Sequence, residues 1–157
     1  MKKILIVDDE QDICQLVQKT LERTDLYNVI STTLPESVVD LCKSEKPDLI
    51  VLDIVMPNMN GREIIKELRN DEATINIMIV VTSGLGEMIY VDKKQEWRWL
   101  PNRPIVKERG DVIKEKSAAR AADAYGVDDY IAKPFSPQTM CDVLEDVFER
   151  QERRSKE

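Results

Sequence analysis

The sequence predicts an α/β fold in which a doubly wound, five-stranded parallel sheet carries helices on both faces. The first observation is a set of continuous apolar runs rich in β-branched residues, at 4–7, 49–52, 77–81 and, more weakly, 130–132. Such runs are typical of strands buried on both faces. The second observation is that segments with helical apolar spacing separate the runs. This alternation is typical of a parallel sheet wound with helices.

The first half of the chain supplies three strands and two helices. The runs at 4–7 and 49–52 are continuous, whereas the segment Asn28 to Thr32 has an apolar centre of two residues between polar flanks. That pattern predicts a strand at the edge of the sheet. Apolar stripes at helical spacing predict the two helices. The stripes are Ile13, Leu16, Val17 and Leu21 for the first helix, and Val38, Leu41 and Cys42 for the second.

The second half begins with a helix whose start is marked by Asn60 and, three residues later, Glu63, an arrangement similar to a capping box. Its apolar stripe is Ile64, Ile65 and Leu68. The last helix has Ser136 as its predicted N-cap and Pro137 at its first position. Its apolar stripe is Met140, Val143, Leu144, Val147 and Phe148.

The interval between the fourth and fifth strands is too long for this pattern. About 50 residues separate Thr82 from Lys133, whereas a loop, a helix, a turn and a strand need roughly 20 to 25. We therefore expect an insertion at about 86–110, ahead of a fourth helix at about 111–125. Without the insertion, the elements predict a flavodoxin-like sheet with strand order 2-1-3-4-5.

Composition limits the class of protein. A chain of 157 residues with a formal charge of -7 predicts one domain over residues 1–150, a charged end at 151–157, and no direct nucleic-acid partner. Three scattered cysteines and no histidine exclude a zinc site and a Cys/His catalytic pair, and they favour a reducing, cytoplasmic location. The apolar runs are too short for a signal peptide or for membrane insertion.

Polar residues follow the predicted strands at one edge of the sheet. They are Asp8 and Asp9 after the first strand, Asp53 at the end of the third, Thr82 and Ser83 after the fourth, and Lys133 after the fifth. The carboxyl ends of parallel strands meet at one edge, so these side chains should lie close together. Neighbouring carboxylates repel by roughly 3 to 4 kcal/mol per pair at an effective dielectric near 20. The cluster therefore needs either raised pKa values or a cation, and Mg²⁺ is the simpler solution because every ligand is oxygen.

Asp53 has the properties of a nucleophile placed where a phosphoryl group can reach it, because carboxylates form acyl phosphates. Three carboxylates and one ammonium leave a formal charge of about -2, which one Mg²⁺ cancels. Lys133 would then pair with the phosphoryl oxygens, and the Thr82 hydroxyl could donate a hydrogen bond to the same group. The alternative is an ordinary solvated face of acidic residues at the strand ends.

Four motifs together resemble the response-regulator receiver domain of bacterial two-component signalling. They are "ILIVDDE", "DLIVLDIVMPNMNG", "IMIVVTS" and "DDYIAKPF", and they occur in this order. The resemblance implies that a sensor histidine kinase or a histidine phosphotransfer protein phosphorylates Asp53. It implies Mg²⁺ held by Asp9, Asp53 and the backbone carbonyl of Val55, with Asp8 nearby. It also implies a cis Lys133-Pro134 bond, and a signalling domain with at most weak self-catalysed phosphorylation and dephosphorylation.

The resemblance further implies a two-state switch, in which Thr82 moves toward the phosphoryl group and Tyr130 turns inward. Without the resemblance, Tyr130 would be interpreted as a residue that caps the sheet. Since no further domain follows the last helix, we expect a stand-alone receiver that acts on a separate downstream protein or passes the phosphoryl group onward in a phosphorelay.

The insertion contains both tryptophans of the chain, Trp97 and Trp99. Residues 88–91 and 97–100 could form a hairpin that turns through 92–95. One hypothesis is a partner-binding or site-covering element, because Trp and Arg are favoured at interfaces. The other is a flap whose tryptophans cover the domain's own surface.

Three other functions compete with a phospho-accepting receiver. A phosphohydrolase of the haloacid dehalogenase type would carry a second aspartate at the position of Val55, and a nucleotide or flavin binder would not place Asp8 and Asp9 in its phosphate loop. A phosphorylation-independent interaction module on the same scaffold remains open, and Mg²⁺ binding without a phosphoryl adduct would favour it.

Overall fold

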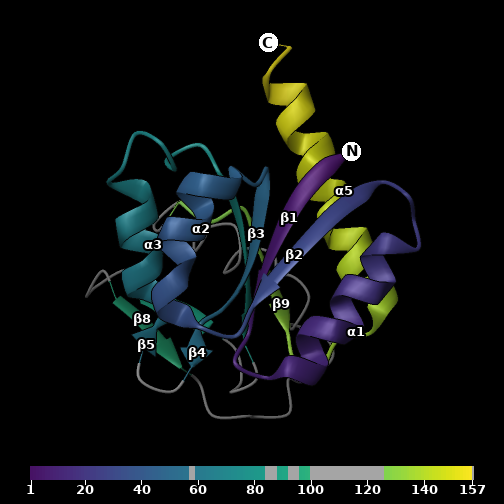
Figure 1. The fold of residues 1–157 in the computed structure, drawn as a ribbon. Helices are drawn as coiled ribbons and strands as arrows, with labels where there is room; N and C mark the ends of the chain where they lie inside the picture. Colours follow the sequence, from purple (N-terminus) through teal and green to yellow (C-terminus); the bar gives the residue numbers. More distant parts are fainter. Residues whose placement is uncertain (57–58, 84–87, 92–95, 100–125, 157) are drawn as a thin grey trace, which may run out of the picture.

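The computed structural model describes residues 1–56, 59–83, 88–91, 96–99 and 126–156, and it contains the predicted parallel sheet (Figure 1). The five strands are β1 (Lys2–Val7), β2 (Tyr27–Thr32), β3 (Leu49–Asp53), β6 (Met78–Ser83) and β9 (Asp129–Ala132). They are all parallel, in the order β2-β1-β3-β6-β9. When these five strands are numbered in chain order, the sheet has the predicted order 2-1-3-4-5. Strand β2 lies at an edge, as expected.

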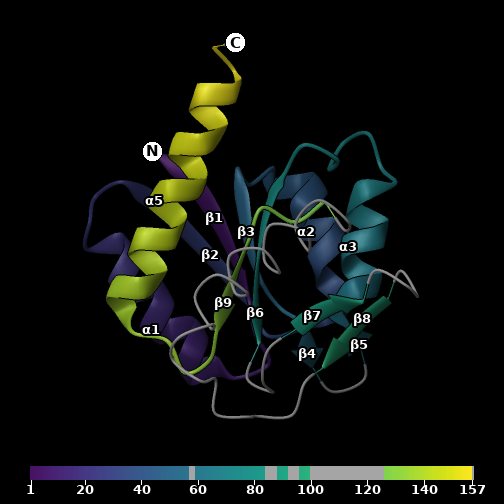
Figure 2. The same cartoon turned by 180° about the vertical axis from the view of Figure 1, so that it is seen from behind.

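Helices cover both faces of the sheet (Figures 1 and 2). On one face lie α2 (Val38–Glu45), which follows the short 3-10 helix η1 (Pro35–Ser37), and α3 (Gly61–Arg69); α1 (Gln11–Glu22) and α5 (Pro137–Arg154) lie on the other. Two buried apolar clusters join these helices to the strands.

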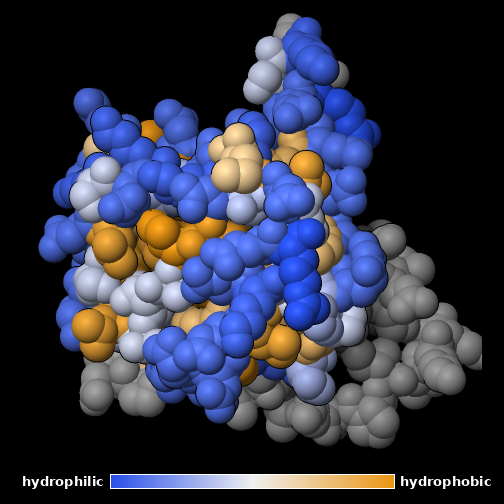
Figure 3. All heavy atoms as spheres, turned by 45° about the vertical axis from the view of Figure 1, so that its right-hand side comes forward, coloured by the Kyte–Doolittle hydropathy of each residue, from blue (hydrophilic) through white to orange (hydrophobic). Residues whose placement is uncertain are grey.

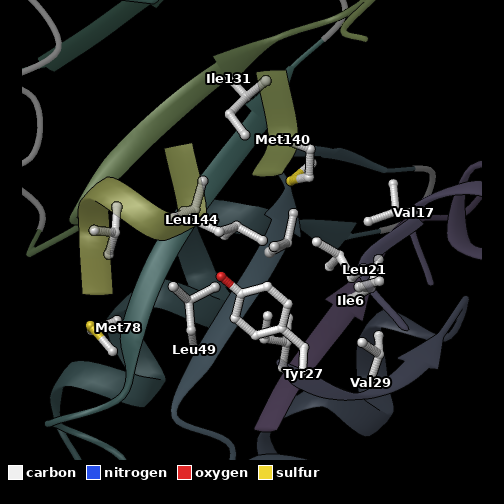
Figure 4. Close-up of a cluster of buried hydrophobic side chains, with 14 of the residues drawn as sticks. Ile6, Val17, Leu21, Tyr27, Val29, Leu49, Met78, Ile131, Met140 and Leu144 are labelled. Atoms are coloured by element: carbon white, nitrogen blue, oxygen red, sulfur yellow. The ribbon is translucent and has the colours of Figure 1, made fainter. Parts of the chain in front are cut away.

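The strands supply side chains to both clusters, since successive residues of a strand point to opposite faces. In β1, Leu5 and Val7 pack beneath α2 and α3, while Ile4 and Ile6 pack beneath α1 and α5. Figure 4 shows the second cluster, in which Leu21 of α1 and Leu144 of α5 pack over the sheet. Two-sided burial of each strand explains the continuous apolar runs in the sequence.

The apolar stripe predicted for the first helix is wrong at one position. Leu16 is 51% exposed, and the buried positions of α1 are Cys14, Val17 and Leu21. These three recur at helical spacing, whereas Leu16 precedes Val17 by one residue and therefore lies about 100° away around the helix.

Helix α5 begins as predicted. The Ser136 hydroxyl accepts a hydrogen bond from the Thr139 N–H at 3.1 Å, and Pro137 is the first helical residue. The helix continues to Arg154, so the charged end expected from residue 151 is helical over its first residues.

No described helix is both long enough and apolar enough to cross a membrane. In Figure 3, hydrophilic side chains predominate on the face shown, and apolar side chains reach the surface in several places between them.

Two short antiparallel hairpins complete the described structure. Strands β4 (Val55–Met56) and β5 (Met59–Asn60) pair just before α3, and β7 (Met88–Val91) pairs with β8 (Glu96–Trp99). The second hairpin confirms the one predicted within the insertion, although its second strand begins one residue earlier than expected. The turn at 92–95, the predicted fourth helix at 111–125 and the rest of the insertion lie outside the described residues.

Candidate functional site

The topology brings the predicted polar residues to the carboxyl edge of the sheet. Asp8 follows β1 directly, Asp53 is the last residue of β3, and Lys133 follows β9. Thr82 and Ser83 belong to β6 itself and do not follow it, which corrects the sequence-based boundary. In the register of the sheet Thr82 is the direct neighbour of Asp53. Thr82 therefore lies beside the central carboxylate of the cluster.

Lys133 joins two carboxylates that are distant in sequence. Its Nζ donates hydrogen bonds to Asp8 Oδ2 at 2.5 Å and to Asp53 Oδ2 at 3.2 Å. All three side chains are largely withdrawn from solvent, with 13%, 3% and 5% of their surface exposed for Lys133, Asp8 and Asp53. Burial lowers the pKa of Lys133, but hydrogen bonds and charge from the two aspartates outweigh burial and raise it above its ordinary value. Lys133 is therefore a buried, charged ammonium.

Asp9 completes a group of three carboxylates with Asp8 and Asp53. One carboxylate oxygen from each residue can be chosen so that all lie within 4.8 Å of one another. Asp9 is exposed, while the other two are buried. Since one ammonium faces three carboxylates, the formal charge is about -2, and the donors are all oxygen. This donor set fits a hard divalent cation such as Mg²⁺.

Backbone contacts fix the orientation of Asp8 and the position of the strand ends. Asp8 Oδ1 accepts a hydrogen bond from the Glu10 N–H at 2.9 Å, and the Asp8 carbonyl accepts one from Cys14 Sγ at 3.4 Å. Burial, together with the charge of Asp8, raises the pKa of the Cys14 thiol, which therefore stays protonated. On the other side of Asp53, the Ile54 N–H donates to the Thr82 carbonyl at 3.0 Å. No local sequence pattern indicates the contacts of Glu10 and Cys14, because these contacts depend on the turn that follows β1.

Two further expectations concern the segment around β9. The Lys133-Pro134 bond is cis, as the resemblance implied. Tyr130 lies in β9, is half-buried and packs against the apolar cluster beneath α2 and α3.

Sequence reasoning assigned no role to Gly61, which ends the second of the four motifs and is the first residue of α3. It is buried, and it packs against the backbone of Asp53 and Ile54. A glycine is an unfavourable helix residue, so its presence at the start of a strongly amphipathic helix was the available signal. Trp97 and Trp99 lie in β8, where they pair with Tyr90 and Met88 of β7 across the second hairpin.

Comparison with known proteins identifies the family. Residues 4–93 match the response regulator receiver domain. The chain therefore belongs to this family, as the four motifs indicated.

Two curated relatives illustrate the similarity. The alkaline phosphatase synthesis transcriptional regulatory protein PhoP of Bacillus subtilis (strain 168) is 31% identical over 151 residues, which cover 96% of this chain and 50% of the relative. The response regulator SaeR of Staphylococcus aureus (strain USA300) is 32% identical over 140 residues, covering 89% of this chain and 47% of the relative. The chain thus spans about half the length of the curated relatives it matches.

Solved structures support the same fold. The chemotaxis protein CheY4 of Vibrio cholerae, crystallised at low pH, is 25% identical with a TM-score of 0.66, and the match covers 94% of this chain and 98% of that one. A CheY-like receiver domain protein of Methanospirillum hungatei has a TM-score of 0.68 at 19% identity, over 98% of both chains, and this second match shows the fold alone.

Proposed function

We propose that Asp53 is the phospho-acceptor of this receiver domain, and that it takes a phosphoryl group from a phosphohistidine of a sensor histidine kinase or a histidine phosphotransfer protein. The observation that carries the proposal is the environment of Asp53. Its carboxylate is buried at the end of β3, receives a hydrogen bond from the Lys133 ammonium, and lies beside Thr82 and within reach of two further carboxylates.

The residues that would hold Mg²⁺ are Asp9 and Asp53, with Asp8 nearby and the backbone carbonyl of Val55 as the ligand that the family suggests. When bound, the ion would act as a Lewis acid toward the phosphoryl oxygens and would cancel the excess negative charge of the carboxylates. Asp8 is the carboxylate closest to Lys133, at 2.5 Å, so its main role would be to hold the ammonium in place.

The transfer forms a bond between a carboxylate oxygen of Asp53 and phosphorus, while the bond from phosphorus to the donor imidazole nitrogen breaks. Lys133 lies 3.2 Å from Asp53 Oδ2 and would pair with a phosphoryl oxygen. The Thr82 hydroxyl would donate a hydrogen bond to another. Positioning and charge neutralisation account for most of the catalysis of phosphoryl transfer, so these contacts suffice for a slow, single-turnover reaction.

The output would be a changed protein-interaction surface. Thr82 would move toward the phosphoryl group, and Tyr130, which is half-buried against the core, would turn further inward. The partner that reads this surface would be a protein, since the net charge of -7 opposes unaided binding to nucleic acid.

The intact mass of the protein after incubation with Mg²⁺ and acetyl phosphate tests the proposal. We expect one phosphoryl adduct in the wild type and none in Asp53→Asn. The control is Asp128→Asn, which changes a carboxylate at the opposite edge of the sheet and should keep the adduct. Mg²⁺ binding without an adduct, both with acetyl phosphate and with a phosphorylated histidine kinase, would reject the proposal in favour of a phosphorylation-independent module.

A further inference from the structure

The segment that follows Asp53 turns back, so that its last residue, Gly61, contacts its first, Ile54. It leaves the sheet at Ile54, forms the short β4-β5 hairpin and enters α3 at Gly61. The Gly61 N–H then donates a hydrogen bond to the Ile54 carbonyl at 3.0 Å. The start of α3 is therefore fastened to the residue next to the proposed phospho-acceptor.

Gly61 lies so close to this backbone that no side chain fits. A Cβ at Gly61 would lie 2.8 Å from Ile54 Cα and 2.9 Å from the Asp53 carbonyl oxygen. Both neighbours are backbone atoms, so a rotamer change cannot relieve the contact. The requirement for glycine here is a close approach of two chain segments.

The peptide between Asp53 and Ile54 is held from two sides. On the side of β6, the Ile54 N–H donates to the Thr82 carbonyl at 3.0 Å. On the side of α3, Gly61 contacts the same peptide. A Cβ at Gly61 must therefore displace either α3 or the backbone that carries the Asp53 carboxylate and the Val55 carbonyl.

We propose that Gly61 is a positioning residue. By allowing the start of α3 to lie close to Asp53 and Ile54, it holds the backbone of Asp53 to Val55 in the position required to bind Mg²⁺ and the phosphoryl group. The inference rests on the proposed function and adds a residue that touches neither the ion nor the phosphoryl group. Residues that support metal ligands typically affect metal affinity by roughly 10- to 100-fold.

Gly126 provides a matched control. A Cβ there would also meet a neighbour at 2.8 Å, the Arg69 Nε, and Gly126 has a φ of +64°, which disfavours any side chain. It precedes β9, at the amino edge of the sheet, opposite the carboxylates. Gly61→Ala and Gly126→Ala should therefore both destabilise the protein, whereas only the first should disturb the site.

The experiment compares the two variants by urea denaturation and by calorimetric titration with Mg²⁺ under conditions in which both are folded. We expect a roughly 10-fold loss of Mg²⁺ affinity in Gly61→Ala and wild-type affinity in Gly126→Ala. Wild-type affinity in a folded Gly61→Ala, or an equal loss in both variants, would overturn the inference. A wild type that binds no Mg²⁺ would instead count against the proposed function.

A measurement on the wild type decides the question if Gly61→Ala does not fold. Amide resonances recorded with and without Mg²⁺ should show a shift of the Gly61 N–H, because its acceptor Ile54 is displaced when the neighbouring carboxylate engages the ion. The Gly126 N–H should not shift. Equal responses of the two glycines would contradict the role of Gly61.

Discussion

The two ends of strands β6 and β9 carry charged clusters of opposite character. At the carboxyl end, the single ammonium of Lys133 contacts Asp8 and Asp53, and Asp9 adds a third carboxylate. At the amino end, Arg69 lies against Asp128 and Arg150 lies against Asp129, so there is one aspartate for each arginine. One cluster has an excess of negative charge, and the other is matched.

The amino-end cluster uses its guanidiniums to join chain segments. Arg69 donates to the carbonyls of Ile75, Ile77 and Gly126, at 3.0, 2.8 and 2.8 Å, and lies 3.9 Å from Asp128. In the same region, the Arg150 guanidinium lies 2.5 Å from Asp129. Arg150 also lies 2.8 Å from Asp146 of its own helix, whose side chain is 56% exposed and is not counted in the cluster. Asp128 also accepts a hydrogen bond from the Ile79 N–H at 2.8 Å.

The difference between the two clusters distinguishes charges that stabilise the fold from charges that form a binding site. Charges withdrawn from solvent stabilise a fold when they are paired and hydrogen-bonded, as are the partly buried charges at the amino end. An unbalanced group of carboxylates costs folding free energy unless a further cation joins it, so its presence at the carboxyl end indicates a site built for a ligand. The following predictions test this contrast, from the largest expected effect to the smallest.

Loss of the Lys133 charge should destabilise the protein most. In metal-free buffer, Lys133→Met leaves buried carboxylates without a counter-charge, and we expect a loss of about 4 kcal/mol in the free energy of unfolding, measured with urea. Mg²⁺ should recover more stability in this variant than in the wild type. Equal stabilisation of both proteins by Mg²⁺ would show that the carboxylates do not share the ion.

The stability difference between the wild type and Lys133→Met should depend on pH. The pKa of Lys133 is raised above its ordinary value of 10.5, because contacts with Asp8 and Asp53 outweigh burial. The stabilisation from Lys133 is therefore fully present below about pH 10.5 and is lost as the pH rises through the folded-state pKa. The stability difference between wild type and Lys133→Met should stay constant from about pH 7 to 9 and shrink in more alkaline solution.

At the opposite end, Arg69→Met should cost about 3 kcal/mol, because it removes the donor of three backbone carbonyls and each such hydrogen bond contributes about 1 kcal/mol. Burial lowers the pKa of Arg69, and Asp128 partly offsets this. Urea denaturation measures the loss, and calorimetric titration should give an unchanged Mg²⁺ affinity. A large fall in Mg²⁺ affinity would contradict the independence of the two clusters.

The same substitution should have opposite effects at the two ends. In metal-free buffer, Asp53→Asn removes repulsion from Asp8 and Asp9 at the expense of one contact with Lys133, and we expect a gain of about 1 kcal/mol. Asp128→Asn weakens a matched contact with Arg69 and should lose about 1 kcal/mol. Thermal unfolding of both variants, without Mg²⁺, measures the signs. A loss in both would remove the argument for excess negative charge at the site.

The smallest loss of stability is expected for Ser136, an uncharged residue that lies close in sequence to Lys133 of the site. Ser136 caps α5 through its hydrogen bond from the Thr139 N–H, and its side chain is exposed, so Ser136→Ala should cost roughly 0.5 kcal/mol. Phosphorylation by acetyl phosphate should continue at the wild-type rate, measured from the intact mass. A marked change in that rate would show that the start of α5 positions Lys133.

The sequence alone determined the five strands of the main sheet, the helices α1, α2, α3 and α5, the order of the sheet and the set of polar residues at its carboxyl edge. These follow from local patterns, because a strand buried on both faces requires a continuous apolar run and a helix buried on one face requires a stripe. Parallel strands then place the residues after Val7, Leu52 and Ala132 at one edge.

Tertiary structure alone decided the contacts between distant segments. Lys133 reaches carboxylates 125 and 80 residues away, and Gly61 lies against the backbone of Asp53 and Ile54. The same holds for Leu16, which was placed in the apolar stripe of α1 but lies on an exposed part of the helix. Periodicity reports which face of an element is buried on average, whereas the partner and the distance of each side chain depend on how the elements pack.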